Sequence, residues 1–321
     1  MLIAGEQIQQ AARAIHQWLE PTPLIRSDYL SNRLGCNVWL KLEMLQPTHS
    51  FKVRGAFNAM SRLTQQQRSA GVVTASGGNH GLAVAYAAHK LDIPAIILLP
   101  RKTSEERIDA IRFFNADVRL HGESWDDANV EARRIERNAG SLYIHPFDDM
   151  HVMAGQGTIV SELVQQIERI DLLVASIGGG GLLSGLISAV HAWSPQTRVI
   201  GVETEGADSM HQSWRAGRIV ELEAITSIAE TLGARSTQPR QFAIITGHAA
   251  SLVTVSDEQA IRALLDILDA EKLLTEPATS CSVAALLTGK IPVDPSENVV
   301  IVLCGANVGL KRVIDWQRRA S

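Results

Sequence analysis

Four short stretches of the sequence carry residue types that could bind an anion or do chemistry. The first surrounds Lys52, which Phe51 and Val53 flank. A lysine between apolar neighbours can lose part of its hydration, which lowers the pKa of its ammonium group. The neutral amine that results is the form that makes a Schiff base with a carbonyl group. A solvated surface lysine is the ordinary alternative.

Two glycine-rich turns each follow a short apolar run. The first is Ser76-Gly77-Gly78-Asn79-His80-Gly81, and the second is Gly178, Gly179, Gly180 and Gly181 followed by Leu182. A glycine turn between a strand and a helix points backbone N–H groups at an anion, and phosphate is the commonest one. Each turn could also be purely structural, because glycine is common in tight turns.

The fourth stretch is Cys304-Gly305-Ala306-Asn307, which follows another apolar run. A polar side chain there could meet a ligand ring, although burial is the more usual fate of a free cysteine. The four consecutive glycines match neither the P-loop nor a clean dinucleotide pattern. Glu203 nevertheless lies at about the spacing of a ribose-binding acid, so a nucleotide-binding dehydrogenase stays open as an alternative.

Short apolar runs alternate with amphipathic runs along the chain, which indicates an open α/β fold. Runs without polar interruption, such as 95–99, are typical of parallel strands covered by helices on both faces. The amphipathic runs include residues 8–19, 56–63 and 125–138, and we interpret Gly140 and Gly201 as turns. The predicted strands are 71–76, 95–99, 117–121, 142–146, 171–177, 198–203 and 298–304. Ligands of such folds bind at the carboxyl ends of the strands, where the four stretches lie.

The composition excludes several classes of protein. The 321 residues are 45% hydrophobic and 20% charged, with a formal net charge of −4, so nothing indicates binding to nucleic acid or to an acidic membrane. No stretch approaches the roughly 20 apolar residues of a membrane helix, and the N-terminus lacks the pattern of a signal peptide. The three cysteines fit neither a disulfide framework nor a zinc site, which favours a reducing, cytoplasmic location.

Taken together, the order and spacing of these stretches resemble the serine/threonine dehydratase family of pyridoxal-phosphate enzymes. This family has the tryptophan synthase β-like fold, also called fold type II. The resemblance runs from about residue 21 to the end of the chain. The matching segments are residues 21–24, 41–43, 50–56, 76–81, 154–158, 178–182, 276–278 and 304–307.

The resemblance implies two interleaved open-sheet α/β domains around a cleft that holds pyridoxal 5'-phosphate. The large cofactor-binding domain would combine residues 1–45 and 148–321, and the small substrate-side domain would be residues 46–147. We also expect a homodimer that acts on a small amino acid.

The family's functional residues can be carried over position by position. Lys52 would form the Schiff base, with Phe51 against the cofactor ring. Residues 178–182 would bind the phosphate, Asn79 would meet the ring hydroxyl, and Cys304 would face the pyridine nitrogen. The substrate carboxylate would be held by Ser76, Gly77 and Asn79.

These residue types fit an elimination reaction. A thiol at the ring nitrogen leaves it unprotonated, so the ring is a weaker electron sink and loss of a β-hydroxyl is favoured over transamination. Lys52 is then the natural base for the α-proton. The expected reaction is loss of water from L-threonine, L-serine or a relative such as 3-hydroxyaspartate or phenylserine, which yields a 2-oxo acid and ammonia.

Several positions depart from the pattern of relatives. A racemase on this scaffold is the alternative reaction, but Gly77 stands where racemases carry the serine that acts on the second face. His49 replaces a frequent glycine, and we interpret it as a tolerated turn residue. Glu203 and Ala207 match a divalent-ion site of some relatives, but Ser209 stands where a carboxylate should be, so we expect no metal.

The run Thr279-Ser280-Cys281-Ser282 is more polar than the small apolar run usual after Glu-Pro-Ala. We expect this run to alter the substrate preference.

Overall fold

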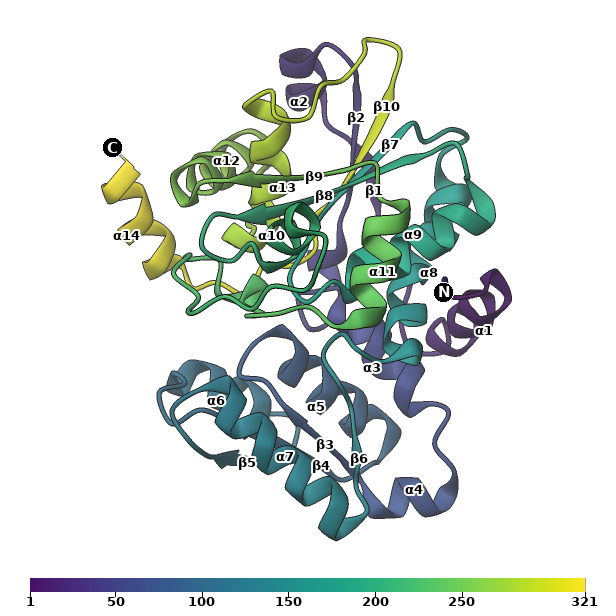
Figure 1. The fold of residues 1–321 in the computed structure, drawn as a ribbon, viewed down its shortest axis with the longest axis vertical. Helices are drawn as coiled ribbons and strands as arrows, with labels where there is room; N and C mark the ends of the chain where they lie inside the picture. Colours follow the sequence, from purple (N-terminus) through teal and green to yellow (C-terminus); the bar gives the residue numbers. More distant parts are fainter. Residues whose placement is uncertain (321) are drawn as a thin grey trace.

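The computed structural model describes residues 1–320 as two sheets with helices around them (Figure 1). The helices are α1 (Gly5–Ile15), α2 (Asp28–Leu34), α3 (Lys52–Met60), α4 (Gln65–Ala70), α5 (Asn79–Leu91), α6 (Glu105–Arg112), α7 (Trp125–Ala139), α8 (Met150–Gln166), α9 (Gly181–Trp193), α10 (Ser209–Ala216), α11 (Pro239–His248), α12 (Asp257–Glu271), α13 (Pro277–Leu287) and α14 (Leu310–Ala320). Two 3-10 turns are η1 (Glu43–Leu45) and η2 (Glu230–Leu232). The strands are β1 (Leu24–Arg26), β2 (Asn37–Lys41), β3 (Val72–Ala75), β4 (Ala95–Leu99), β5 (Asp117–Leu120), β6 (Leu142–Tyr143), β7 (Leu172–Ser176), β8 (Arg198–Thr204), β9 (Ser251–Val255) and β10 (Asn298–Val302).

The larger sheet joins the two ends of the chain. Its six strands run in the order β1-β2-β10-β7-β8-β9, so β10, near the C-terminus, pairs with both β2 and β7. All of its pairs are parallel except β1 with β2. The strands of its centre are buried on both faces, which explains why they are continuous apolar runs.

The smaller sheet is built from a single internal segment. Its four strands run in the order β5-β4-β3-β6 and all are parallel. In Figure 1 this sheet and helices α4 to α7 form the lower half of the molecule, and the larger sheet lies in the upper half. The two interleaved open sheets confirm the predicted fold class, whereas the domain limits at residues 46 and 147 stay a prediction.

Helices α3, α8 and α9 pack closely because glycine lines their contacts. A Cβ atom at Gly155 would lie 2.7 Å from the carbonyl oxygen of Arg54, and one at Gly185 would lie 2.4 Å from that of Met153. Larger residues would push these helices apart. Because Lys52 is the first residue of α3, this close packing fixes its backbone relative to α8.

A buried ionic cluster joins α3 to α8 and to the first part of the chain. Arg54 donates to both carboxylate oxygens of Glu43, at 2.7 and 2.8 Å, and to both of Glu162, at 2.5 and 2.8 Å. Glu162 also accepts from the Lys41 ammonium at 2.6 Å. Arg54, Lys41 and Glu43 are each 0% exposed, so the charges are compensated within the protein rather than by water.

The seven predicted strands are all present, but one predicted turn is wrong. Gly201 lies inside β8, where a Cβ atom would come within 2.2 Å of Ile177 Cδ1. This glycine makes room for packing and does not turn the chain. The helix predicted from residue 56 begins earlier, at Lys52, and strands β1, β2 and β9 were not predicted. Among residues 1–320, no helix is long and apolar enough to cross a lipid bilayer.

Candidate active site

The start of α3 is anchored to the loop after β10. The backbone N–H of Phe51 donates to the carbonyl of Cys304 at 3.0 Å, and Ser50 forms a β-bridge with Gly305. Two of the stretches identified in the sequence, around Lys52 and Cys304, therefore lie side by side although they are about 250 residues apart in the chain.

The Lys52 amine has no carboxylate partner within ion-pair distance among the described residues. Its Nζ donates to the carbonyl of Pro146 at 2.8 Å and lies 5.2 Å from the centre of the Phe51 ring. Burial lowers the pKa of Lys52 to about 8, although Cys304 and Glu276 act in the opposite direction. An amine with this pKa is neutral in roughly a tenth to a fifth of the molecules near pH 7, far more often than an ordinary lysine with a pKa of about 10.4, and the neutral form is the one that Schiff-base chemistry requires.

The turn at residues 76–81 connects β3 to α5. Gly81 is required there because a Cβ atom would lie 1.9 Å from the carbonyl oxygen of Ser76. The Ser76 hydroxyl accepts from the backbone N–H of Gly78 at 3.3 Å. A Cβ atom on Gly77 would lie 3.0 Å from Thr103 Cγ2, a close contact that a small movement of this side chain relieves.

His80 in the same turn is a packed, neutral side chain. Its Nε2 bonds to the carbonyl of Ile144 at 3.0 Å, and it is 3% exposed. Burial and the nearby Lys52 lower the pKa of His80 to about 3. His80 is therefore unsuited to deliver a proton at neutral pH.

Asn79 lies at the start of α5 and is held from two sides. Its Nδ2 donates to Glu276 Oε1 at 2.8 Å, and its Oδ1 accepts from Asn307 Nδ2 at 2.6 Å. Sequence reasoning assigned no role to Glu276 or Asn307. The signal was present, since both residues lie in segments that match the family.

Two of the four glycines, Gly179 and Gly181, lie against one aromatic residue. Cβ atoms at Gly179 and Gly181 would lie 2.3 and 2.8 Å from atoms of Phe147, and Gly180 has a φ of +93°, which favours glycine. Gly181 begins α9, a helix of 13 residues whose N-terminus favours negative charge. The loop and the helix end thus form a cradle into which side chains could not fit.

Cys304 lies in a buried group of hydroxyls. Its Sγ is 3.2 Å from Ser176 Oγ and 3.1 Å from Thr279 Oγ1, and the residue is 3% exposed. Burial raises the pKa of Cys304 to about 11, and Glu276 adds to this effect. The sulfur is therefore a neutral thiol at physiological pH.

Two members of the polar run after Thr279 are hydrogen-bonded to backbone carbonyls, and the prediction that the run alters substrate preference stays a prediction. The hydroxyl of Ser280 donates to the carbonyl of Ala260 at 2.7 Å, and Cys281 Sγ donates to that of Ala278 at 3.3 Å. Thr279 is the member of the run that contacts Cys304.

The carboxylate of Glu203 accepts hydrogen bonds from the backbone of a helix. The donors are the backbone N–H groups of Met210 at 3.2 Å and His211 at 2.7 Å, at the start of α10. Ser209 donates to the carbonyl of Ala234 at 2.9 Å. Within residues 1–320, no three histidine, cysteine or acidic residues are grouped as metal ligands. Neither a ribose-binding nor a metal-binding role for Glu203 finds support in these contacts.

His49 has a backbone φ of +52°, in the region that favours glycine. Its side chain is exposed, and its backbone is held by Gln46 and Ala306. Glycine adopts this conformation more readily than other residues do, which fits the glycine expected there from the family resemblance.

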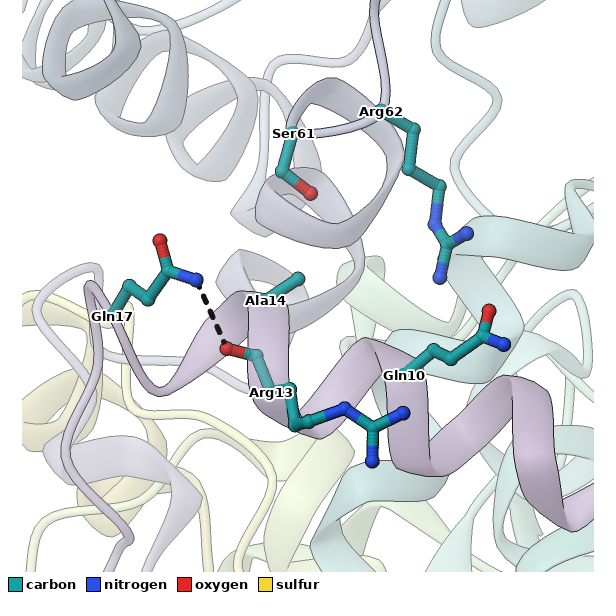
Figure 2. Close-up of a pocket in the computed structure, with 6 residues that line it drawn as sticks. All are labelled: Gln10, Arg13, Ala14, Gln17, Ser61 and Arg62. Carbon is teal, nitrogen blue, oxygen red and sulfur yellow. Dashed lines mark hydrogen bonds between the residues drawn. The ribbon is translucent and has the colours of Figure 1, made fainter.

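A separate surface pocket, with a volume of about 400 Å³, lies between α1 and the end of α3 (Figure 2). None of the predicted site residues lines it.

The residues of the cleft fit pyridoxal phosphate. The glycine cradle at a helix N-terminus suits its phosphate, and the unpaired Lys52 amine suits its aldehyde. Glu276 Oε2 is buried without a hydrogen-bond partner among the described residues, so this acceptor is available to a polar group of a ligand. The fold and this site together define an enzyme that uses this cofactor.

The comparisons with known proteins also indicate an enzyme that uses pyridoxal phosphate. The family model described as "Pyridoxal-phosphate dependent enzyme" matches residues 15–305, and the chain belongs to this family. The chain is 36% identical to an L-threonine ammonia-lyase of Thermotoga maritima, over 97% of this chain and 77% of the relative. It is 37% identical to a phenylserine dehydratase of Ralstonia pickettii, over 91% and 90%.

Solved structures give the same result. A maize serine racemase matches with a TM-score of 0.94 and 29% identity, over 99% of this chain and 98% of the other. A threonine deaminase of Solanum lycopersicum matches with a TM-score of 0.91 and 32% identity, over 99% and 95%. The fold is thus common to racemases and lyases, and the choice of reaction depends on the residues of the cleft. Membership of this family excludes the dehydrogenase alternative.

Proposed function

We propose that this chain is a pyridoxal-phosphate-dependent ammonia-lyase that eliminates water from a 3-hydroxy amino acid. The substrate is L-threonine, L-serine or a relative such as 3-hydroxyaspartate or phenylserine, and the products are a 2-oxo acid and ammonia. Relatives named threonine ammonia-lyase and phenylserine dehydratase, both more than 30% identical over most of the chain, support this substrate class.

The observation that carries the proposal is the pairing of a neutral thiol with a weakly basic lysine. Cys304 and the start of α3 are joined by a backbone hydrogen bond, and burial raises the pKa of the thiol while it lowers that of Lys52. When bound, pyridoxal phosphate draws electrons from the α-carbon of an attached amino acid, and less strongly when its ring nitrogen is unprotonated. A thiol with a pKa of about 11 does not supply that proton as an acid.

The residues of the chain then divide the work. Lys52 holds the cofactor and, when displaced by the substrate amine, takes the α-proton. In net terms the α-proton and the β-hydroxyl leave together as one water, and the enamine that remains consumes one water when it hydrolyses to the 2-oxo acid and ammonia. The glycine loop at residues 178–181 and the N-terminus of α9 bind the phosphate, with Leu182 completing the loop.

The remaining roles complete the proposed site. Phe51 lies against the cofactor ring and Asn79 faces its hydroxyl. The turn with Ser76, Gly77 and Asn79 holds the substrate carboxylate through its polar side chains and backbone donors. Residues 46–147 are proposed to form the substrate-side domain.

Gly77 favours the lyase over a racemase. A racemase needs a group that returns a proton to the face opposite Lys52, and Gly77 has no side chain to do so. His80, the other titratable residue of the turn, is held neutral against Ile144.

A substrate panel tests the proposal. The purified protein, saturated with pyridoxal phosphate, is incubated with L-threonine, L-serine, 3-hydroxyaspartate and phenylserine, and 2-oxo acid and ammonia are measured. We expect equal amounts of both products from at least one substrate, and none with Lys52→Ala. Chiral chromatography of the remaining substrate detects racemisation. The absence of 2-oxo acid from every substrate, or D-amino acid formed as fast as 2-oxo acid, would overturn the assignment.

We further propose that the enzyme acts in the cytoplasm as a homodimer. The three cysteines are free and buried, which suits a reducing compartment. Light scattering of the purified protein measures the oligomeric state directly, and a monomeric mass would exclude the dimer.

A further inference from the structure

The carboxyl group of Glu276 bonds to Asn79 and Thr231 rather than to the backbone of its own helix. Glu276 is the N-cap residue of α13, yet its side chain makes no capping hydrogen bond. Instead, its Oε1 accepts from Asn79 Nδ2 at 2.8 Å and from the Thr231 hydroxyl at 2.9 Å. The residue is 3% exposed. A helix N-terminus is a favourable place for a carboxylate, so its use elsewhere calls for a physical reason.

Asn79 is held on its other side as well. Asn307 Nδ2 donates to Asn79 Oδ1 at 2.6 Å and to the carbonyl of Thr48 at 2.9 Å. The amide of Asn79 therefore has its nitrogen toward Glu276 and its oxygen toward Asn307. An amide nitrogen carries two N–H groups, and Glu276 takes one of them. The second N–H remains for a ligand.

Gly305 keeps this arrangement compact. A Cβ atom there would lie 2.9 Å from Glu276 Oε1 and 3.1 Å from Asn79 Nδ2. The loop that carries Cys304 thus passes directly beside the pair, and the three elements that meet here are α5, α13 and the segment after β10.

We infer that Glu276 is a positioning residue that, together with Asn307, fixes the amide of Asn79 so that its free N–H meets the ring hydroxyl of the cofactor. The inference deepens the proposed function and rests on the same placement of the cofactor. Without Glu276 the amide loses an acceptor and can rotate, and the hydrogen bond to the ring becomes one of several alternatives.

Glu276 also raises the pKa of Lys52 through its charge, so a purely electrostatic role must be separated from positioning. Glutamine in place of Glu276 keeps an amide oxygen that accepts from Asn79 and Thr231 but removes the charge. Alanine removes both. The two substitutions therefore divide the effects of hydrogen bonding and charge.

The experiment measures cofactor affinity rather than turnover. Apoprotein is titrated with pyridoxal phosphate, and the dissociation constant and visible absorption maximum are recorded for the wild type, Glu276→Gln, Glu276→Ala, Asn79→Ala and the double alanine variant. A buried donor or acceptor that loses its partner costs about 1–3 kcal/mol, so Glu276→Ala and Asn79→Ala should each raise the dissociation constant roughly 5- to 150-fold. The double variant should bind no more weakly than Asn79→Ala alone. We expect Glu276→Gln within about threefold of the wild type.

Other outcomes overturn the inference. If Glu276→Ala weakens binding further in the Asn79→Ala background, Glu276 does not act through Asn79. If Glu276→Gln is as weak as Glu276→Ala, its charge is what matters. Thermal unfolding of each apoprotein checks the fold, and Glu258→Ala, an exposed glutamate of α12, is the control. If Glu276→Ala does not fold, Glu276→Leu, which also removes the acceptor but keeps most of the side-chain volume, provides the same cycle in both Asn79 backgrounds. Cofactor that binds as expected, with no 2-oxo acid from any substrate, would refute the lyase and leave this inference standing.

Discussion

Lys52 and Arg54 lie two residues apart on α3, and the fold treats their charges in opposite ways. Arg54 is fully buried and donates to every oxygen of two carboxylates. The Lys52 amine, on the cleft side, donates to a single backbone carbonyl. One helix therefore carries a structural cation and a reactive amine within one turn.

The difference shows how pairing decides what burial does to a charged group. Burial alone would lower the pKa of Arg54, but Glu43 and Glu162 raise it above its ordinary value. Burial alone would raise the pKa of Glu162, yet Arg54 and Lys41 lower it to about 2. At Lys52 the same desolvation is only partly offset by Cys304 and Glu276, and the pKa falls to about 8. The ionic cluster around Arg54 therefore contributes to the folded structure, whereas the Lys52 amine is available for reaction.

Removing the amine of Lys52 should abolish activity without loss of stability. In Lys52→Ala we expect turnover to fall by at least about 10³-fold, because the group that holds the cofactor and moves the proton is gone. The midpoint of thermal unfolding of the apoprotein should stay the same or rise, because a partly desolvated ammonium is removed. The measurements are 2-oxo acid release, cofactor absorbance after gel filtration, and calorimetry.

Lys102→Ala, on an exposed loop, is the matched control and should leave all three measurements unchanged. A Lys52→Ala protein that retains the cofactor absorbance of the wild type after gel filtration would place the reactive lysine elsewhere.

Removing the paired charge of Arg54 should instead lower the stability of the folded protein. Arg54→Met leaves Glu43 buried without a cation, whereas Glu162 keeps Lys41. Breaking a buried pair in this way costs about 3–5 kcal/mol of the free energy of unfolding. Adding Glu43→Gln should recover part of this loss. Denaturant unfolding of both variants measures it.

The exposed Arg112→Met should change the free energy of unfolding by less than about 0.5 kcal/mol. Equal stability of Arg54→Met and the wild type would contradict the comparison, because the cluster would then contribute nothing to the folded state.

The pH dependence should separate the two regions. The neutral fraction of Lys52 rises about tenfold per pH unit below its pKa. The rate at which apoprotein captures pyridoxal phosphate covalently should therefore rise with pH and level off above about 8. Glu162 has a lowered pKa when folded, so its stabilisation is present above its ordinary pKa of 4.5 and is lost as pH falls toward about 2. Stopped-flow absorbance and acid titration by circular dichroism measure the two effects.

In Glu162→Gln the acid transition should become shallower while the midpoint of cofactor capture stays near 8. A capture rate that is flat from pH 6 to 9 would show that Lys52 is not the titrating amine.

The sequence alone identified most of the candidate reactive residues, but it did not predict the contacts between distant segments. Lys52, the glycine loop and Cys304 could be found because each follows or precedes a recognisable element. The ionic cluster could not, since Arg54 and Glu162 are separated by 108 positions and no local pattern links them. Gly201 shows the same limit: its glycine is needed for contact with Ile177, which only the folded chain brings near.

Phe147 lies against Gly179 and Gly181 of the glycine loop, and this contact was not predicted from the sequence. Its contact with Gly179 joins the segment after β6 to the loop after β7, and nothing in either segment alone specifies it. Side chains that act through contacts between distant segments remain outside what spacing can predict.

Adding a hydroxyl to the turn at residues 76–81 should change the reaction more than the stability of the protein. Gly77→Ser places a hydroxyl in the turn at residues 76–81, where the close contact of its Cβ atom with Thr103 is relieved by a small shift of that side chain. We expect some D-amino acid from L-serine, because a hydroxyl then lies on the face where a racemase returns the proton. The fraction should stay well below that of 2-oxo acid, because neutral His80 cannot assist it.

Chiral chromatography of recovered L-serine decides this, with Gly78→Ser as the neighbouring control. A Cβ atom at Gly78 meets nothing closer than Thr231 Cγ2 at 3.8 Å, so the control tests an added hydroxyl in the same turn at a different position. Racemisation by Gly77→Ser and not by Gly78→Ser would place the missing acid–base group at residue 77. Substantial D-serine from the unmodified enzyme would instead show that the face opposite Lys52 already has a proton donor, and the argument from Gly77 would fail along with the lyase assignment.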